Sequence, residues 1–237
     1  MLLKTLNKFI KKIGLKKNDR LIIFSNLAAF GIYDKKLPEL LINVIKKKLG
    51  PLGEIVIPTF SLNSKKVIEL DTVSKVDNGI LAEYYFKYYN VKRSNSIFHS
   101  HIGDGKMFLN HCRLSKSFSF GNNSDFDFFK KKNYKILSIG LEPEYFLTYL
   151  HHIEQLKKVN YRKWIILNKE IKKKFKKKKI KIKYFARKNN KSYLNLNMLF
   201  NKYLKKKVTY KYCKLKYGNS YLLKVSELHQ VLTKYFN

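Results

Sequence analysis

The chain has 237 residues, 45% of them apolar, which is enough for one full hydrophobic core and excludes an intrinsically disordered chain. Lysine and arginine number 51 against 16 aspartate and glutamate residues, so the formal charge is +35 and the surface attracts anions and repels cations. No apolar run approaches the roughly 18 residues that span a bilayer. Lysines also interrupt the N-terminal apolar segment that a signal peptide would need, so a cytoplasmic protein is expected.

The first predicted element is a helix at the N-terminus. Its apolar residues recur at helical spacing and share one face; they are Leu2, Leu3, Leu6, Phe9, Ile10 and Ile13. We expect this face to pack on the domain. The alternative is a basic helix that lies on a membrane surface.

Strands and helices then alternate. Short apolar runs predict buried strands, and apolar residues at helical spacing predict the helices between them. The predicted strands are 21–24, 54–57 and 134–139, and the predicted helices are 38–49 and 78–90. Pro58 is expected to end the second strand, because proline restricts the residue before it and lacks an N–H group.

The C-terminal half continues the alternation. A helix that opens at Glu142 and Pro143 is expected to carry His151, because proline is accepted in a first helical turn and acidic residues suit the helix dipole there. Further predicted strands are 164–167, 180–185, 208–215 and 221–225, and the last predicted helix is 226–236. The pattern predicts an α/β fold: a single domain over 1–237, with a mixed β-sheet covered by helices on both faces.

Much of the positive charge lies between Lys172 and Lys191, with more at 205–207. This tract is either a solvated loop or a basic hairpin. Tyrosines are interleaved with the lysines, as in some nucleic-acid binders. The basic residues are nearly all lysine, however, which argues against base recognition and bidentate phosphate contacts. Nucleic acid is therefore not expected as a partner. Peripheral contact with an anionic membrane stays open. The alternative explanation of the many lysines is a compositional bias.

The segment 148–154 brings a histidine and a carboxylate together. His151 and Glu154 are three residues apart, so they are neighbours on one face of a helix. A carboxylate beside an imidazole fixes its tautomer and raises its basicity, which suits a general base. A surface ion pair is the alternative for such spacing. His152 points to another face and is expected to be structural.

No metal site is predicted. Cys112 and Cys213 are isolated, which fits a reducing compartment and small buried apolar side chains. Three further histidines form a loose group, but no Asp, Glu or Cys stands at ligand spacing beside them; they are His99, His101 and His111.

Together with the His151 and Glu154 pair, a series of short segments in a fixed order resembles the aminoglycoside 3-N-acetyltransferase family. They are N-D-R at 18–20 followed by 21–27, I-V-I-P-T-F-S at 55–61, N-G-I-L-A-E at 78–83, V-K-R-S at 91–94 with Ser100, F-G-N-N-S at 120–124, K-I-L-S-I-G at 135–140, Y-R at 161–162 and Y-G-N-S at 217–220. The resemblance runs from about residue 14 to the C-terminus. It implies an antibiotic N-acetyltransferase-like enzyme that transfers acetyl from acetyl-CoA to an amine of an amino sugar, without a metal.

The resemblance also implies roles for individual residues. His151 takes a proton from the acceptor, Glu154 orients His151, and backbone N–H groups or a hydroxyl hold the developing oxyanion. The residues expected along the acyl-CoA site are Ser25, Thr59, Arg93, Ser94 and Ser100. Tyr161 and Arg162 are expected to border the acceptor. The chain departs from the family pattern R-S-x-H-P-x-x-S, because Ser96 and Ile97 replace the usual His-Pro.

Charge bears on the choice of acceptor. Aminoglycosides are polycations, whereas the basic segment 165–216, which we expect to border the acceptor site, is rich in lysine. We therefore expect an acceptor that is neutral or anionic overall, such as a nucleotide-linked or glycan amino sugar. Two alternatives stay open: a catalytically lapsed module that binds CoA or sugar, and a basic protein that binds nucleic acid or an anionic membrane.

Overall fold

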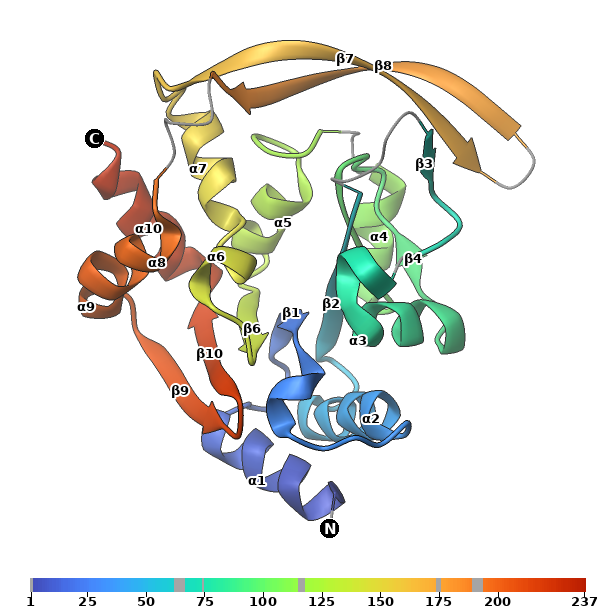
Figure 1. The fold of residues 1–237 in the computed structure, drawn as a ribbon, viewed down its shortest axis with the longest axis vertical. Coiled ribbons are helices and arrows are strands. Elements are labelled where there is room, and N and C mark those ends of the chain that lie inside the picture. Colours follow the sequence, from blue (N-terminus) through green and yellow to red (C-terminus); the bar gives the residue numbers. More distant parts are fainter. Residues whose placement is uncertain (1, 62–66, 74, 115–117, 174–175, 189–193) are drawn as a thin grey trace.

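A seven-stranded mixed sheet forms the centre of the computed structural model, which describes residues 2–61, 67–73, 75–114, 118–173, 176–188 and 194–237 (Figure 1). The strand order is β4-β5-β2-β1-β6-β10-β9. The strands are β1 (Arg20–Ser25), β2 (Glu54–Phe60), β4 (Lys92–Arg93), β5 (His99–Gly103), β6 (Lys135–Ile139), β9 (Tyr210–Leu215) and β10 (Gly218–Lys224). The sheet confirms the predicted α/β fold.

The middle of the sheet is parallel and its edges are antiparallel. β1 pairs in parallel with β2 and β6, whereas β5 and β10 run antiparallel to their neighbours. The prediction that Pro58 ends the second strand was wrong, because β2 continues to Phe60. The proline is tolerated because the pairing of β2 with β1 extends only to Val56, so its missing N–H interrupts no ladder on that side.

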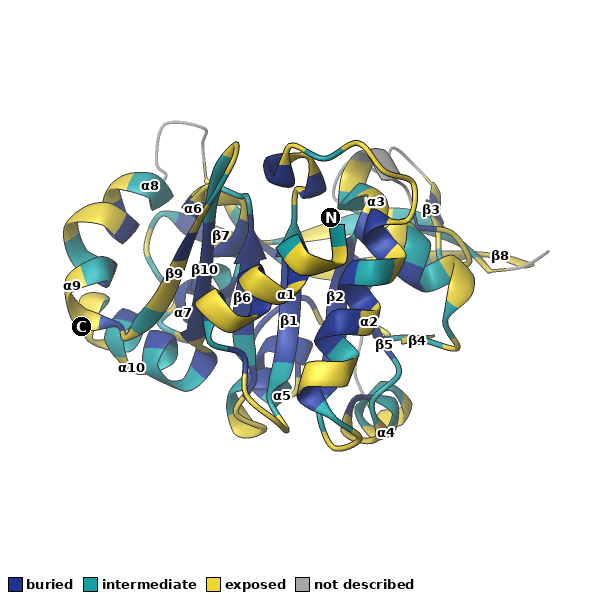
Figure 2. Ribbon diagram, turned by 90° about the horizontal axis from the view of Figure 1, so that it is seen from below, coloured by how far each residue is buried: buried dark blue, intermediate teal, exposed yellow. Residues whose placement is uncertain are grey.

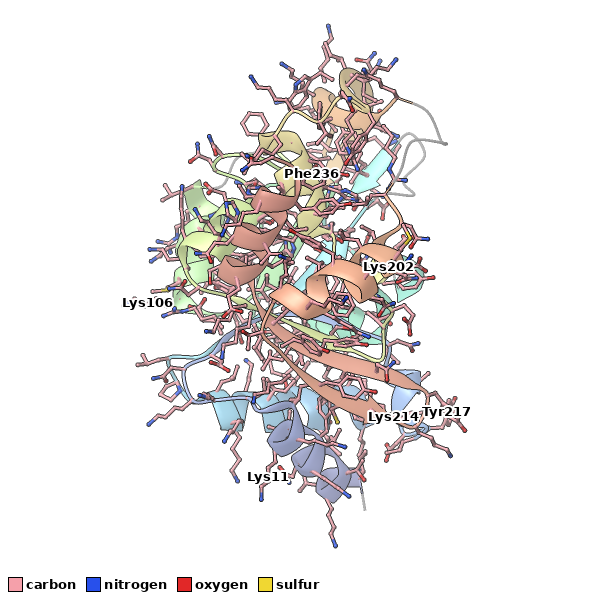
Figure 3. All side chains as sticks on the ribbon, turned by 90° about the vertical axis from the view of Figure 1, so that its left-hand side faces the viewer. Lys11, Lys106, Lys202, Lys214, Tyr217 and Phe236 are labelled. Carbon is pink, nitrogen blue, oxygen red and sulfur yellow. The ribbon has the colours of Figure 1, made fainter. Side chains whose placement is uncertain are left out.

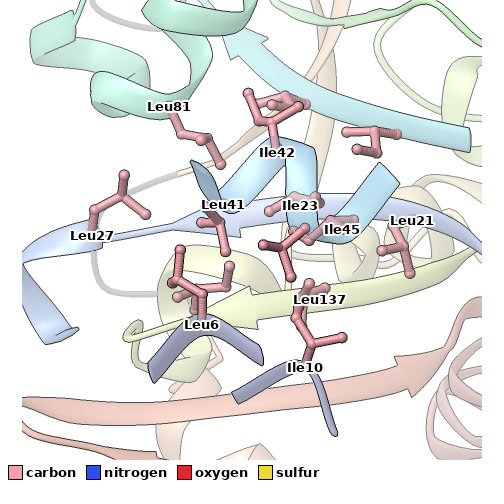
Figure 4. Close-up of a cluster of buried hydrophobic side chains, with 14 of the residues drawn as sticks. Leu6, Ile10, Leu21, Ile23, Leu27, Leu41, Ile42, Ile45, Leu81 and Leu137 are labelled. Atoms are coloured by element: carbon pink, nitrogen blue, oxygen red, sulfur yellow. The ribbon is translucent and has the colours of Figure 1, made fainter. Parts of the chain in front are cut away.

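Successive apolar residues of the central strands pack alternately into two hydrophobic layers, one on each face of the sheet. Ile23 of β1 packs with one face and Ile22 with the other, as expected for strands buried on both sides (Figure 2). Helices α1 (Leu2–Ile13), α2 (Leu37–Leu49) and α3 (Lys75–Tyr88), with the short η1 (Leu27–Phe30), cover one face. In Figure 4, Leu6 and Ile10 of α1 lie among side chains of α2, β1 and β6.

The opposite face carries the helices that build the candidate site. They are α4 (Lys106–Leu114), α5 (Asp125–Lys131), α6 (Pro143–Phe146), α7 (Tyr149–Leu156) and α10 (Val225–Tyr235). The segments α8 (Leu196–Leu199), η2 (Phe200–Leu204) and α9 (Lys205–Lys207) join this layer through Leu199, Phe200 and Leu204. The single helix expected from Glu142 is instead two helices, α6 and α7, with a break at Leu147 and Thr148.

A second sheet of three strands lies across one end of the molecule (Figure 1). It consists of β3 (Val67–Glu69), β7 (Arg162–Lys173) and β8 (Lys176–Arg187), in the order β3-β7-β8. The β7–β8 pair is therefore the basic hairpin that was one of the two interpretations of the lysine tract. Ile68 and Ile182 attach it to Ile97 and Phe98 in a small hydrophobic cluster of its own.

The N-terminal helix packs on the domain, as expected. Leu6 and Ile13 are fully buried, although Leu3 is 51% exposed and does not share their environment. Among the described residues, no helix combines the length and the apolar composition needed to cross a bilayer.

Gly140, directly after β6, offers a test of how tightly the end of this strand packs against η1. Its φ is +65°, and an added Cβ would lie 2.1 Å from the Cβ of Ala29. We expect Gly140→Ala to lower the free energy of unfolding by about 2–4 kcal/mol, from backbone strain and overpacking together.

Gly14→Ala is the matched control, because Gly14 has a similar φ of +74° but only ordinary contacts around an added Cβ. Strain alone predicts a loss of about 1–2 kcal/mol there. Urea denaturation measures both variants, and equal losses would contradict the tight packing of Gly140 against η1.

Candidate active site

His151 and Glu154 meet on α7, as their spacing predicts. His151 Nδ1 lies 2.6 Å from Glu154 Oε2. The Glu154 side chain is only 2% exposed, whereas 18% of the His151 side chain remains accessible. The pair is therefore neither a surface ion pair nor fully sealed from ligands.

Glu154 stays ionised because several donors surround it. Arg162 Nη2 lies 2.7 Å from Oε2, and the Tyr161 hydroxyl donates to Oε1 at 2.8 Å. Burial alone would raise the pKa of Glu154, but the hydrogen bond from His151 and the charge of Arg162 lower it overall. Tyr161 and Arg162, which were expected to border the acceptor, thus both contact the carboxylate of Glu154.

The contacts of Glu154 also fix the protonation of His151. Arg162 Nη2 is 2.8 Å from His151 Nδ1. Nδ1 can either donate to Glu154 or accept from Arg162, but it cannot do both. Glu154 is closer and accepts only, and Arg162 has the same carboxylate as its own acceptor, so Nδ1–H donates to Glu154. The lone pair is then on Nε2. Burial lowers the pKa of His151 below its usual value, against the opposing effect of Glu154, so the imidazole is neutral near pH 7.

A series of ring contacts connects His151 with the end of β2. Phe120 lies edge-on to His151 at 5.7 Å, and the ring of His99 lies 4.4 Å from Phe120 and 4.9 Å from Phe60. His99 is buried, and its Nδ1 has no hydrogen-bond partner within the described part of the chain. Burial holds the pKa of His99 well below its usual range, so it is neutral.

Two hollows border this ring series, one at Phe60 and the other at Phe120. The strand-end hollow has a volume of about 200 Å³, and Ser25, Phe60 and Gly79 are among its lining residues. The aromatic hollow, of about 240 Å³, is lined by Phe118, Ser119, Phe120, Asn122, Gln155, Trp164, Lys183 and Tyr184. None of the residues that line the aromatic hollow is acidic, whereas Asp77 lines the strand-end hollow.

Arg93, Thr59 and Ser100 form one network beside the strand-end hollow. Arg93 Nε donates to Ser100 Oγ at 2.8 Å, and Nη2 donates to the Thr59 carbonyl at 2.8 Å. Nη1 donates to the carbonyls of Leu70 at 3.2 Å and Thr72 at 3.0 Å. Burial lowers the pKa of Arg93 to about 10, which leaves it charged at neutral pH. Its donors thus fasten β2, β5 and the 69–72 segment together.

Ser94 belongs to a second polar cluster, centred on Asp125. Its hydroxyl donates to the carboxylate of Asp125, and His101 Nδ1 and His111 Nε2 each lie 2.8 Å from that carboxylate. Burial would raise the pKa of Asp125, but the hydrogen bonds from the two histidines lower it to about 2. Two of the three loosely grouped histidines therefore share one buried aspartate, which the sequence spacing did not reveal.

No group of three metal-type ligands occurs among the residues that the structure describes. His152 packs against Tyr149 and Phe126, and its Nδ1 accepts from the Gly121 N–H at 3.2 Å. Sequence reasoning missed His99, Trp164 and Lys183 as parts of the site. Only the tertiary fold brings β5 and the β7–β8 hairpin close to α7, and no local sequence motif predicts this proximity.

Comparisons with known proteins identify the family and the fold. A sequence model of the family described as aminoglycoside 3-N-acetyltransferase matches residues 22–237. A search of curated proteins found no match.

Solved structures share the fold over nearly the whole chain. YokD protein from Bacillus subtilis is 18% identical with a TM-score of 0.81, covering 99% of this chain and 92% of its own. AAC-IIIb in a binary complex with CoASH is 15% identical with a TM-score of 0.81, covering 98% and 95%. Sisomicin-bound AAC-VIa is 15% identical with a TM-score of 0.83, covering 98% and 96%.

The Arg93 network predicts that lysine cannot replace this arginine. An ammonium group has three donors at one point and cannot reach Ser100, Thr59 and the 69–72 carbonyls together. We expect Arg93→Lys to lower the free energy of unfolding by about 2–4 kcal/mol, because buried carbonyls lose their partners.

The exposed Arg113 of α4 provides the control, and Arg113→Lys should stay within about 0.5 kcal/mol of the parent. Thermal and urea unfolding measure both variants. Equal stabilities of the two would show that the guanidinium does not brace the strands.

Proposed function

The chain belongs to the aminoglycoside 3-N-acetyltransferase family, and we propose that it transfers the acetyl group of acetyl-CoA to an amine of an amino sugar. The observation that carries the proposal is the His151 and Glu154 pair, with its 2.6 Å contact and a neutral imidazole that is accessible on one side. A positioned base of this kind is what amine acylation requires.

The proposed reaction is direct transfer with His151 as general base. The acceptor nitrogen forms a bond to the thioester carbonyl carbon while His151 Nε2 takes the proton that this nitrogen loses. The tetrahedral intermediate then collapses, the C–S bond breaks, and the imidazolium returns the proton to the leaving sulfur of CoA. Glu154 holds the Nδ1–H and stabilises the transient imidazolium, as a buried carboxylate does for a catalytic histidine.

Arg162 and Tyr161 act through Glu154 in this proposal. Their contacts of 2.7 Å and 2.8 Å fix the carboxylate, and so the plane of the His151 ring. They are therefore positioning residues at the border of the site.

Acetyl-CoA is proposed to approach from the strand-end hollow. Ser25 lines this hollow, and Thr59, Arg93 and Ser100 brace the strands beside it. Ser94 holds the loop after β4 through Asp125. Because the donors of Arg93 all have partners on the protein, we assign Arg93 to shaping the donor site rather than to phosphate contact. The CoASH complex of AAC-IIIb supports CoA as the acyl carrier for this fold.

The acceptor is proposed to be an amino sugar that is neutral or anionic overall, such as a nucleotide-linked or glycan amino sugar. The aromatic hollow lies next to His151 through Phe120, and its lining offers Lys183 but no carboxylate. The exposed faces of Trp164 and Phe118, each 46% accessible, suit the apolar face of a sugar ring. A polycationic aminoglycoside would meet repulsion instead of ion pairing.

Acetyl-CoA thiol release tests the proposed function. The acceptor panel contains nucleotide-linked amino sugars, free amino sugars and aminoglycosides, and His151→Ala should reduce acceptor-dependent release by about 10²- to 10⁴-fold. His229→Asn, on α10, is the matched control and should retain activity, because His229 lines neither hollow. Circular dichroism confirms folding of both variants.

Release that survives His151→Ala would contradict the base assignment. Equal or better turnover of a polycationic aminoglycoside than of the other acceptors would contradict the charge argument. An absence of release with every acceptor would contradict the proposed transfer itself.

The lowered pKa of His151 predicts the pH dependence of kcat. Only the unprotonated imidazole accepts a proton, so activity is present above its pKa and is lost as the pH falls through it. Burial lowers this pKa from its usual 6.5, so the acidic limb should fall at a pH below 6.5. Glu154→Gln removes a charge that raises the pKa, so its limb should move to still lower pH while kcat decreases. A limb above pH 7 would argue against His151 as the base.

A further inference from the structure

The outer face of the β7–β8 hairpin carries an ordered row of lysines. Along β8, Lys177, Lys179, Lys181 and Lys183 occupy every second position and are exposed. Lys178 is exposed as well, but from position 180 onward the alternate residues pack inward: Ile182 is buried with Phe98, and Ile180 and Tyr184 pack on the same cluster. Because strand side chains alternate, the lysines share the opposite face.

Only the first of these four charges has an ion-pair partner in the described part of the chain. Lys177 Nζ lies 3.5 Å from Glu170, but Lys179, Lys181 and Lys183 form no ion pair within the described residues. Glu170 is also the one acidic residue in the sequence from Arg162 to Lys188. An ordered row of unpaired ammonium groups on one face is a surface that an anion can neutralise.

The row begins at the candidate active site. Lys183 lines the aromatic hollow, and its Nζ lies 4.8 Å from the ring centre of Trp164. Farther along the same strands is a larger hollow of about 600 Å³, which we call the lysine hollow. Its lining residues are Val67, Asn168, Lys169, Glu170, Lys179, Ile180 and Lys181. The lysine row therefore leads from the neighbourhood of His151 to a second hollow.

The spacing of the row limits the ligand. Alternate residues of a strand are about 7 Å apart, so the three unpaired lysines span about 13 Å. That length exceeds a single phosphate and suits two linked phosphates with a further group beyond them. The aromatic hollow is smaller than the roughly 300–1,000 Å³ of sites that enclose whole ligands, so it would hold one part of a larger acceptor.

We propose that the hairpin binds the anionic part of a nucleoside diphosphate-linked amino sugar. The amino sugar occupies the aromatic hollow against Trp164, its two phosphates follow Lys183 and Lys181, and the nucleoside reaches the lysine hollow. This assignment rests on the proposed function, because it takes the sugar amine to be the group acetylated at His151. Lysine suits this task as a point charge for phosphate oxygens.

Other exposed lysines lie outside the hairpin and line neither the aromatic hollow nor the lysine hollow. In Figure 3, Lys11, Lys106 and Lys214 extend from α1, α4 and β9, which lie outside the hairpin. A variant in which these exposed lysines are changed has the same loss of net charge as a variant of the row. The two variants therefore separate a defined subsite from a general attraction of anions.

The test uses the whole protein at about 0.15 M salt, where long-range attraction is screened. Calorimetry measures the binding of uridine diphosphate, and steady-state assays compare UDP-glucosamine with glucosamine as acceptors. For Lys179→Gln/Lys181→Gln/Lys183→Gln, we expect at least about a 10-fold rise in the Kd for uridine diphosphate, because charge-assisted contacts are lost. The ratio of kcat/KM for UDP-glucosamine over glucosamine should fall to a similar extent.

The control Lys11→Gln/Lys106→Gln/Lys214→Gln should leave both quantities within about two-fold of the parent. An equal loss in the control would overturn the subsite in favour of nonspecific charge. Acetylation of glucosamine without any binding of uridine diphosphate would also overturn the subsite but leave the proposed function intact. Binding that depends on the row, without acetyl transfer to any acceptor, would support the subsite and refute the proposed function.

Discussion

The buried carboxylate of Glu154 is the constraint on which the site depends. A carboxylate that is 2% exposed persists in the ionised form only if hydrogen bonds and opposite charge replace the water it has lost. Arg162, Tyr161 and His151 supply them, and they come from two different elements and the turn between them. Because Arg162 is the first residue of β7, the requirement to neutralise Glu154 also fixes the base of the hairpin against α7.

Asp125 is a second buried carboxylate that is stabilised in the same way. It is 1% exposed, and it collects donors from Ser94 after β4, His101 on β5 and His111 on α4. Removal of any donor would leave a buried charge undercompensated, so these elements are held in one arrangement. That arrangement places β5, and with it His99, between Phe60 and Phe120. The two buried carboxylates thus fix the relative positions of the elements that surround the candidate site.

The sequence predicted what depends on local pattern. Buried strands such as β1 and β6, the amphipathic face of α1 and the His151 and Glu154 pair follow from periodicity and spacing, and the structure has them. Elements decided by tertiary contacts were not predicted. The short β4 and β5 contain polar residues that are buried only because Arg93 and Asp125 satisfy them. The break between α6 and α7 likewise has no proline or glycine to signal it.

The same distinction applies to charge. The number of lysines in the chain does not determine which direction each one faces. In β8 that direction is set by the apolar residues, because Ile182 must pack on Phe98 and its neighbours Lys181 and Lys183 must then point outward. A shift of one residue in the pairing of β7 with β8 would reverse every side chain. The apolar positions that attach the hairpin therefore also determine where its charge lies relative to His151.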